Sequence, residues 1–171
     1  MDVEVLKHLG YASGYFDLKM FEDALREADL VLALEPDQTQ AIAIKSAVFW
    51  HTGRLNEAEP FVAKLAEQHP HNSAIWVNLA YIRRRTQSLE AAAATLQRAF
   101  AVNPRDALAH FNMACYRAVQ HRTIEALALL RYALHLDPKL KTVAETEPDF
   151  AAVRNLPEFQ ELIHERSHTR K

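Results

Sequence analysis

The feature that most constrains this chain is a proline that recurs every 34 residues, at Pro36, Pro70, Pro104 and Pro138. No insertion or deletion interrupts the three intervals. Two further columns keep the same step with small side chains: Ala12, Ser46, Ala80 and Ala114, and Ala24, Ala58, Ala92 and Ala126. Several columns in one register indicate a repeat architecture.

Each repeat is predicted to contain two helices. In the third, residues 73–85 place apolar side chains at the spacing of one helix face. A polar break at 86–88 precedes a second amphipathic helix over 90–102, which ends at Asn103 because the residue before a proline avoids the α region. One such pair cannot bury its own apolar face, so consecutive pairs are expected to stack.

A 34-residue helix–turn–helix unit with small residues at the eighth and twentieth places and proline at the thirty-second resembles the tetratricopeptide repeat (TPR). Residues 76–80 and 110–114 look like its opening W-x-N-L-G segment, and residues 53–58 match its G-x-x-x-E-A turn. The resemblance covers about residues 5–138. It implies an all-α, right-handed α-α superhelical solenoid of four repeats, at 5–38, 39–72, 73–106 and 107–140, followed by C-terminal capping helices and a short tail in 139–171.

The eleventh place of the repeat departs from the family pattern. It is aromatic at Tyr15 and Phe49 but basic at Arg83 and Arg117. We expect the stems of the two arginines to pack while their guanidinium groups reach solvent. The alternative is that both arginines pair with nearby acids.

The register is lost after Pro138, where two short helices opened by proline and acids are expected at 148–154 and 157–163. Repeat arrays need a cap that covers the last apolar face. We expect that role for Phe150, Val153, Phe159, Leu162 and Ile163. Alternatively, the segment docks in the protein's own groove or on a neighbouring copy.

Composition excludes several function classes. Three glycines, where average usage would supply about twelve, leave little material for phosphate-binding loops or hairpins. The turns inside the four repeats place Lys19, Gly53, Gln87 and His121 at corresponding positions, so glycine is kept at one of the four.

Charge and cysteine content bear on partners and compartment. A net charge of −2 provides no global field for nucleic acid or an anionic membrane, although residues 1–36 are acidic and residues 73–138 basic. Cys115 is the sole cysteine, which excludes an intrachain disulfide and favours a cytoplasmic location. The start of the chain lacks a signal-peptide pattern, and no apolar run is long enough to predict membrane insertion.

One catalytic pattern is present, the H-E-x-x-H zinc signature at residues 164–168. Only three residues follow it, so no downstream segment can supply a third ligand, and we expect no metal site. G-x-S-x-G and P-loop motifs are absent from the sequence. No enzymatic activity and no cofactor are therefore expected.

In TPR proteins the first helix of each repeat lines a concave groove. Carried over position by position, the resemblance implies a partner-binding groove formed by Phe16, Trp50, His51, Asn78, Tyr81, Arg84, Arg85, Phe111 and Asn112. Aromatic rings offer large contact areas and arginines can clamp a carboxylate. The family's clamp for chaperone tails is not expected, because its lysine and asparagine correspond here to Leu9 and Ser13, or to Ala43 and Ala47. Alternatively, Trp50 and Tyr81 pack between repeats and the arginines are solvated.

The expected function is a non-catalytic scaffold that holds a peptide or helix of another protein, with the arginines favouring an acidic one. Two alternatives stay open. The chain could be a self-assembling structural unit that forms a homo-oligomer by joining its acidic start to a neighbour's basic middle. It could also be a chaperone for a secreted substrate.

Overall fold

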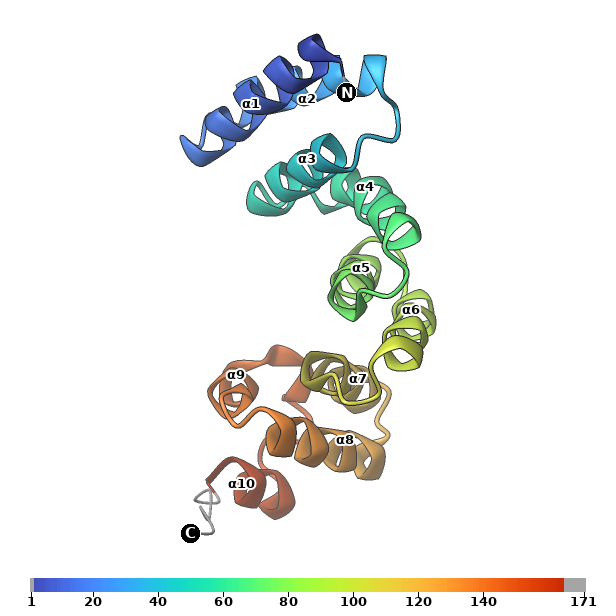
Figure 1. Ribbon diagram of the computed structural model, residues 1–171. Coiled ribbons are helices and arrows are strands. Elements are labelled where there is room, and N and C mark those ends of the chain that lie inside the picture. Colours follow the sequence, from blue (N-terminus) through green and yellow to red (C-terminus); the bar gives the residue numbers. More distant parts are fainter. Residues whose placement is uncertain (1, 165–171) are drawn as a thin grey trace, which may run out of the picture. The chain divides into compact units, whose positions relative to one another are not determined.

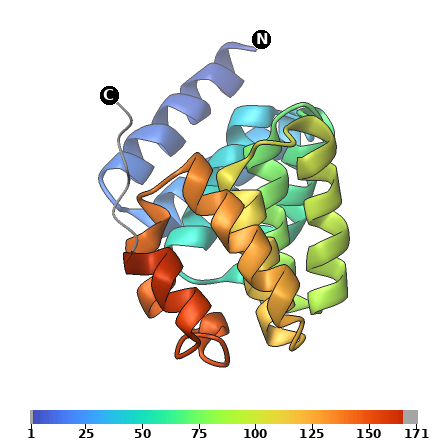
Figure 2. The same cartoon turned by 90° about the horizontal axis from the view of Figure 1, so that it is seen from below.

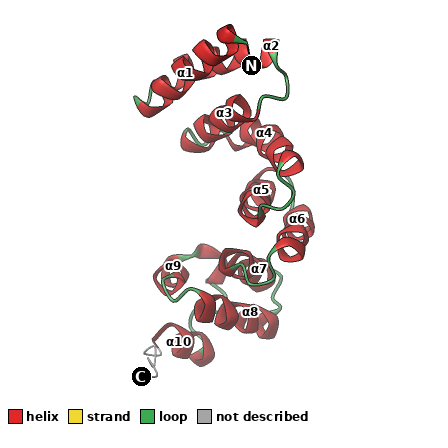
Figure 3. Cartoon of the chain, in the orientation of Figure 1, coloured by secondary structure: helices red, strands yellow, loops and turns green. Residues whose placement is uncertain are grey.

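The computed structural model describes residues 2–164, and this part of the chain consists of helices joined by short loops (Figures 1 and 3). The helices are α1 (Val3–Asp17), α2 (Phe21–Leu34), α3 (Thr39–His51), α4 (Leu55–Gln68), α5 (Ser73–Thr86), α6 (Leu89–Val102), α7 (Ala107–Val119), α8 (Thr123–Leu136), α9 (Leu140–Thr146), the 3₁₀ helix η1 (Pro148–Phe150) and α10 (Pro157–His164). The predicted all-α class is thereby confirmed for the described residues.

The chain forms two compact units, residues 1–92 and 93–171, and α6 runs from one into the other. Within the first unit each helix from α1 to α5 packs against the next one along the chain. Within the second, α7 packs against α8, η1 lies on α7, and α10 contacts α8 and α9 (Figures 1 and 2). The first unit therefore contains repeat helices, whereas the second combines repeat helices with the C-terminal elements.

The periodic proline has a local structural role between one helix pair and the next. Backbone N–H groups of Gln38, Asn72 and Asp106 each donate to the carbonyl three residues earlier, at 3.0–3.2 Å, so that the proline occupies the second position of a tight turn. The same three residues then accept hydrogen bonds with their side chains from the first turn of α3, α5 and α7. Each turn therefore ends one helix and delivers the N-cap of the next.

The turns inside the repeats use left-handed backbone at three of the four corresponding positions. Lys19 and His121 have φ of 59° and Gly53 has 71°. The next residue in each turn donates back to the carbonyl five residues earlier, which is the Schellman closure of a helix end. In the third repeat α5 runs on to Thr86, and Gln87 has φ of −126° instead. The low glycine count therefore leaves two non-glycine residues in a conformation that favours glycine.

The small columns are buried. Ala12, Ser46, Ala80 and Ala114 are all buried, as is the second column of alanines. A side chain of this size lets neighbouring helix backbones approach while larger residues fill the remaining space.

Arg83 and Arg117 do not follow the expectation of solvated guanidinium groups. Arg83 Nε lies 3.2 Å from Glu59 of α4, and Arg117 Nε lies 3.3 Å from Glu125 of α8. Both side chains are less than one-third exposed. A half-buried guanidinium group is costly without a counter-charge, so pairing, the alternative of the two readings, is what the structure contains.

The C-terminal elements pack on α7 and α8 within the second unit. The helix expected at 148–154 is limited to the 3₁₀ helix η1 over Pro148–Phe150, the one expected at 157–163 is α10, and α9 was not predicted. The side chains that they bury are Phe150, Val153, Phe159, Leu162 and Ile163. None of the described helices combines the length and hydrophobicity needed to cross a bilayer.

Candidate functional site

Two groups of predicted groove residues come together in the first unit. In one, the Phe16 ring of α1 lies 5.6 Å from the ring of His51 at the end of α3. Phe21, the first residue of α2, completes the group, with its ring stacked on His51 at 6.1 Å and 6.0 Å from Phe16. Three helices therefore contribute one ring each to a continuous aromatic contact.

The second group begins at the neighbouring residue. The Trp50 ring of α3 lies 5.0 Å from the Tyr81 ring of α5. The Arg85 guanidinium carbon lies 3.6 Å above the Tyr81 ring centre, one helical turn further along α5. Trp50 keeps 39% of its surface exposed, which is a large exposed fraction for an aromatic residue. We call Phe16, Trp50, His51, Tyr81 and Arg85 the aromatic–arginine surface.

Local structure explains why these side chains lie where they do. Gln38 and Asn72 cap the starts of α3 and α5, which sets where each helix begins. The Trp76 indole N–H donates to the Pro70 carbonyl at 3.0 Å and ties α5 to the turn before it. Tyr81 and Arg85 are four residues apart on α5, so both project from one side of that helix.

Asn78 and Arg84 belong to the same helix but show different environments. Asn78 is exposed and Arg84 is half-buried. The structure therefore places five of the predicted residues of the first unit in two ring groups, Phe16 with His51 and Trp50 with Tyr81 and Arg85. Asn78 and Arg84 lie on the same helix as Tyr81 and Arg85.

Phe111 and Asn112 lie on α7, in the second unit. Asn112 is half-buried, and Phe111 is only 4% exposed because the Phe150 ring packs edge-on against it at 5.5 Å. The partner of Phe111 in the structure is thus a residue of the same chain.

A neighbouring cation–aromatic cluster was missed by the sequence reasoning. Lys45 Nζ lies 4.7 Å from the Phe61 ring centre, and the Arg54 guanidinium lies 4.6 Å from that of Phe49. Phe49 and Phe61 are themselves 5.7 Å apart. The i, i+4 spacing of Lys45 and Phe49 was a visible signal, whereas the contacts across helices were not. Phe21 was missed because its column holds Leu55, Leu89 and Thr123 in the other repeats.

Arg54 also organises the acids around it. Its Nε and Nη2 donate to the two carboxylate oxygens of Glu57 at 2.7 Å each, and Nη1 donates to Glu22 at 3.1 Å. This bidentate hydrogen bonding lowers the pKa of Glu57 below its ordinary value and raises the pKa of Arg54. The cluster is a charge-balanced support beside the aromatic–arginine surface.

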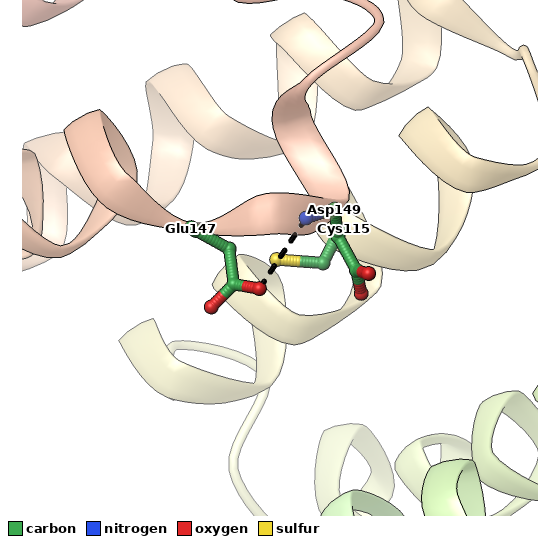
Figure 4. A group of neighbouring side chains, drawn as sticks. All are labelled: Cys115, Glu147 and Asp149. Atoms are coloured by element: carbon green, nitrogen blue, oxygen red, sulfur yellow. Dashed lines mark hydrogen bonds between the residues drawn. The ribbon is translucent and has the colours of Figure 1, made fainter.

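One group of metal-ligating residue types occurs in the described part of the chain. The Sγ of Cys115 and one carboxylate oxygen each of Glu147 and Asp149 lie within 4.8 Å of one another (Figure 4). The Glu147 carboxylate already accepts a hydrogen bond from the Asp149 N–H, so it acts as the cap of η1. Residues 165–168 of the H-E-x-x-H pattern lie outside the described residues.

The second unit has a hollow of about 390 Å³ among α6, α7 and α8. It is lined by Gln97, Phe100, His110, Met113, Arg117, Glu125, Ala128 and Leu129. None of these residues is among the predicted groove residues, and the Arg117–Glu125 ion pair lies in its wall.

Comparison with known proteins agrees with this architecture. Residues 14–140 match the family model described as "Psidin, N-terminal TPR repeats region". No curated protein sequence matches the chain.

Solved structures with the same fold include a MamA protein, at a TM-score of 0.80 and 15% identity over 95% of this chain and 92% of that one. MamA 41-end from Desulfovibrio magneticus RS-1 superposes with a TM-score of 0.69 at 17% identity, over 79% and 76% of the two chains. YrrB, described as "a TPR protein with an unusual peptide-binding site", gives 0.70 at 20% identity, over 91% and 80%.

Proposed function

Because the chain belongs to the tetratricopeptide-repeat family, we propose that it is a non-catalytic scaffold that binds a segment of another protein on the aromatic–arginine surface. The observation that carries this proposal is the convergence of Trp50, Tyr81 and Arg85, with rings 5.0 Å apart and an arginine stacked at 3.6 Å. TPR proteins mediate protein–protein interactions, and this surface has the side chains that such contacts favour.

The energetic argument rests on residue type and exposure. Tryptophan, tyrosine and arginine contribute disproportionately to binding energy. The two aromatic rings contribute large contact areas at a low entropy cost, and the guanidinium group can bind a carboxylate with two hydrogen bonds. Trp50 and Arg85 are exposed, while Tyr81 is half-buried between them, so the surface is already organised before a partner arrives. The likeness to YrrB adds support for a peptide as the bound element.

Phe111 has a different role in this proposal. Since Phe150 covers it, Phe111 supports the cap, and the partner contacts are assigned to residues of the first unit. Asn78 and Arg84 are proposed as flanking contacts and Asn112 as a secondary one. We place the protein in a reducing, cytoplasmic compartment, because its one cysteine is buried and unable to form an intrachain disulfide.

Affinity capture with matched variants tests the proposal. Proteins retained by the wild-type chain and by Ile124→Ala, an exposed residue of the second unit, should be lost with the Trp50→Ala, Arg85→Ala double variant. Circular dichroism should show that all three chains are equally helical. If the double variant retains the same proteins in the same amounts, the surface is not where partners bind.

Self-assembly is a second candidate, supported by exposed apolar residues on the first helix pair. Val3 and Leu6 of α1 and Leu30 and Leu34 of α2 are each about half exposed or more. Sedimentation velocity at low and high salt distinguishes the two types of association. Charge-driven assembly should weaken with salt and apolar assembly should persist, whereas a monomer under both conditions would end this candidate.

A further inference from the structure

Residues 147–150 of the C-terminal segment pack on one face of α7, the first helix of the fourth repeat. Phe150 is fully buried and packs edge-on against Phe111 of α7. One helical turn further along α7, Glu147 and Asp149 each place a carboxylate oxygen within 4.8 Å of the Cys115 sulfur, and the two acids flank it in Figure 4. The segment 147–150 thus runs along α7 with its acids toward the C-terminal end of the helix and its aromatic ring toward the N-terminal end.

The repeat register transfers this arrangement to α5. The residue 34 positions before Phe111 is Val77, and the residue 34 positions before Cys115 is Tyr81. Val77 is only 5% exposed, so the register carries over the position of the carboxylates but not that of the aromatic ring. The residue one turn after Cys115 is Val119, and its counterpart on α5 is Arg85. An acidic–aromatic segment laid on α5 in the same direction would therefore bring its carboxylates to the Tyr81–Arg85 pair.

Arg85 is suited to receive them. Its neighbour Arg83 is neutralised by Glu59, but within residues 2–164 no Asp or Glu side chain forms an ion pair with Arg85. The guanidinium group stacks on Tyr81, which orients it, and its Nη1 donates a long hydrogen bond of 3.5 Å to the Tyr81 carbonyl. Its remaining in-plane N–H groups can donate to a carboxylate. The Trp50 ring beside Tyr81 offers an exposed apolar surface for an accompanying aromatic side chain.

We infer that the aromatic–arginine surface binds an extended segment of another protein in which acidic residues precede an aromatic one, as in Glu-Pro-Asp-Phe, with the carboxylates on Arg85 and the aromatic ring beside Trp50. The inference rests on the proposed function and specifies the chemistry of the partner. The chain's own residues 147–150 are the pattern for that ligand.

Fluorescence anisotropy with the full chain tests the inference. The probe is a labelled peptide copied from residues 146–152, and its matched counterpart has both acids replaced by lysine. The acidic peptide should bind the wild type at least about tenfold more tightly than it binds Arg85→Glu, because a close charge pair becomes a repulsion. The lysine peptide should show the reverse preference.

Arg105→Glu is the matched control, since Arg105 is an exposed residue of a turn in the second unit and carries the same charge change. It should bind the acidic peptide as the wild type does. Equal binding of the acidic peptide to wild type and Arg85→Glu, equal binding of both peptides to the wild type, or no saturable binding would each overturn the inference. The proposed function would still be judged separately, by the loss of captured partners with the double variant.

Discussion

The first helices of the third and fourth repeats, α5 and α7, differ in what covers the same face of each helix. On α7 the face is covered by the chain's own residues, because Phe150 packs on Phe111 and leaves it 4% exposed. On α5 the counterpart of Phe111, Val77, is also buried, and the difference begins one turn later, where α5 carries Tyr81 and Arg85 beside an exposed Trp50. The same repeat position is therefore covered by the chain itself on α7, at Cys115, and half-buried on α5, at Tyr81, where we propose that a partner binds.

The difference in residue type follows from burial. A face covered within the chain has Phe111 and Cys115, which gain most from removal from water. The face of α5 has tyrosine and arginine instead, whose polar ends remain compatible with water, as the proposed binding surface requires. Four experiments examine this contrast, beginning with the one expected to have the largest effect.

The largest difference in stability is expected between Phe150→Ala, on the covered face of α7, and Trp50→Ala, beside α5. Removing a fully buried ring that contacts Phe111 and Phe159 should lower the free energy of unfolding by about 3–5 kcal/mol. Trp50→Ala should cost only about 1 kcal/mol, because that side chain is 39% exposed. Urea unfolding followed by far-ultraviolet circular dichroism measures both, and equal losses would remove the distinction between a covered and an open face.

Glu59→Ala examines the support beneath α5. Glu59 accepts hydrogen bonds from Arg83, Thr86 and Gln87, so its removal should destabilise the fold by about 1–3 kcal/mol. Glu125 pairs with Arg117 in the second unit as Glu59 pairs with Arg83 in the first. Glu125→Ala should lower the free energy of unfolding by less, because the Glu125 side chain is 46% exposed and that of Glu59 is 18% exposed. Glu67→Ala, an exposed residue on the same helix as Glu59, serves as the control. A larger loss for Glu125→Ala than for Glu59→Ala would contradict the burial argument.

The left-handed turns at Lys19 and His121 should respond alike to glycine although they lie in different units. Lys19→Gly and His121→Gly should each stabilise the protein by about 0.5 kcal/mol, because the strain of a left-handed non-glycine residue exceeds the added entropy of the unfolded chain. Gln87→Gly should instead destabilise it by about 0.5–1 kcal/mol, since φ there is −126°. Thermal unfolding measures the three changes. A gain at Gln87, or losses at the other two, would refute the role of backbone conformation.

The smallest expected effect concerns the Arg54–Glu57 pair in the first unit. Hydrogen bonding to Arg54 lowers the folded-state pKa of Glu57, so the pair's contribution is fully present above the ordinary glutamate pKa of about 4.3. That contribution disappears as pH falls through the lowered value. Carbon-detected NMR titration should show the Glu57 pKa return toward the ordinary value in Arg54→Gln, and an unchanged pKa would rule out the pairing as its cause.

Much of the fold followed from the repeat register, because each column reports a local structural requirement. The 34-residue proline predicted where helices end, and the structure adds that the proline-centred turn also delivers the N-caps Gln38, Asn72 and Asp106. The left-handed turns at Lys19 and His121 agree with their place in the column of Gly53. Gln87 belongs to the same column but has φ of −126°, so the column alone does not predict the backbone conformation.

Contacts outside the register could not be read from the sequence. Phe111 satisfies the pattern of a groove residue, and its burial depends on Phe150, which lies in the segment where the register is lost. The pairing of Arg83 with Glu59 depends in the same way on the packing of α4 against α5, because these residues are 24 positions apart. Pattern therefore located the candidate residues, while packing decided which of them are exposed.

Residue-resolved NMR of the full chain with the unlabelled acidic–aromatic peptide tests the central claim most directly. If the face of α5 is open and that of α7 is filled, signals of the Trp50 indole, Tyr81 and Arg85 should shift on titration. Those of Phe111, Cys115 and Phe150 should remain in place. Shifts confined to α7 and the C-terminal segment, with none at Trp50 or Arg85, would contradict the account.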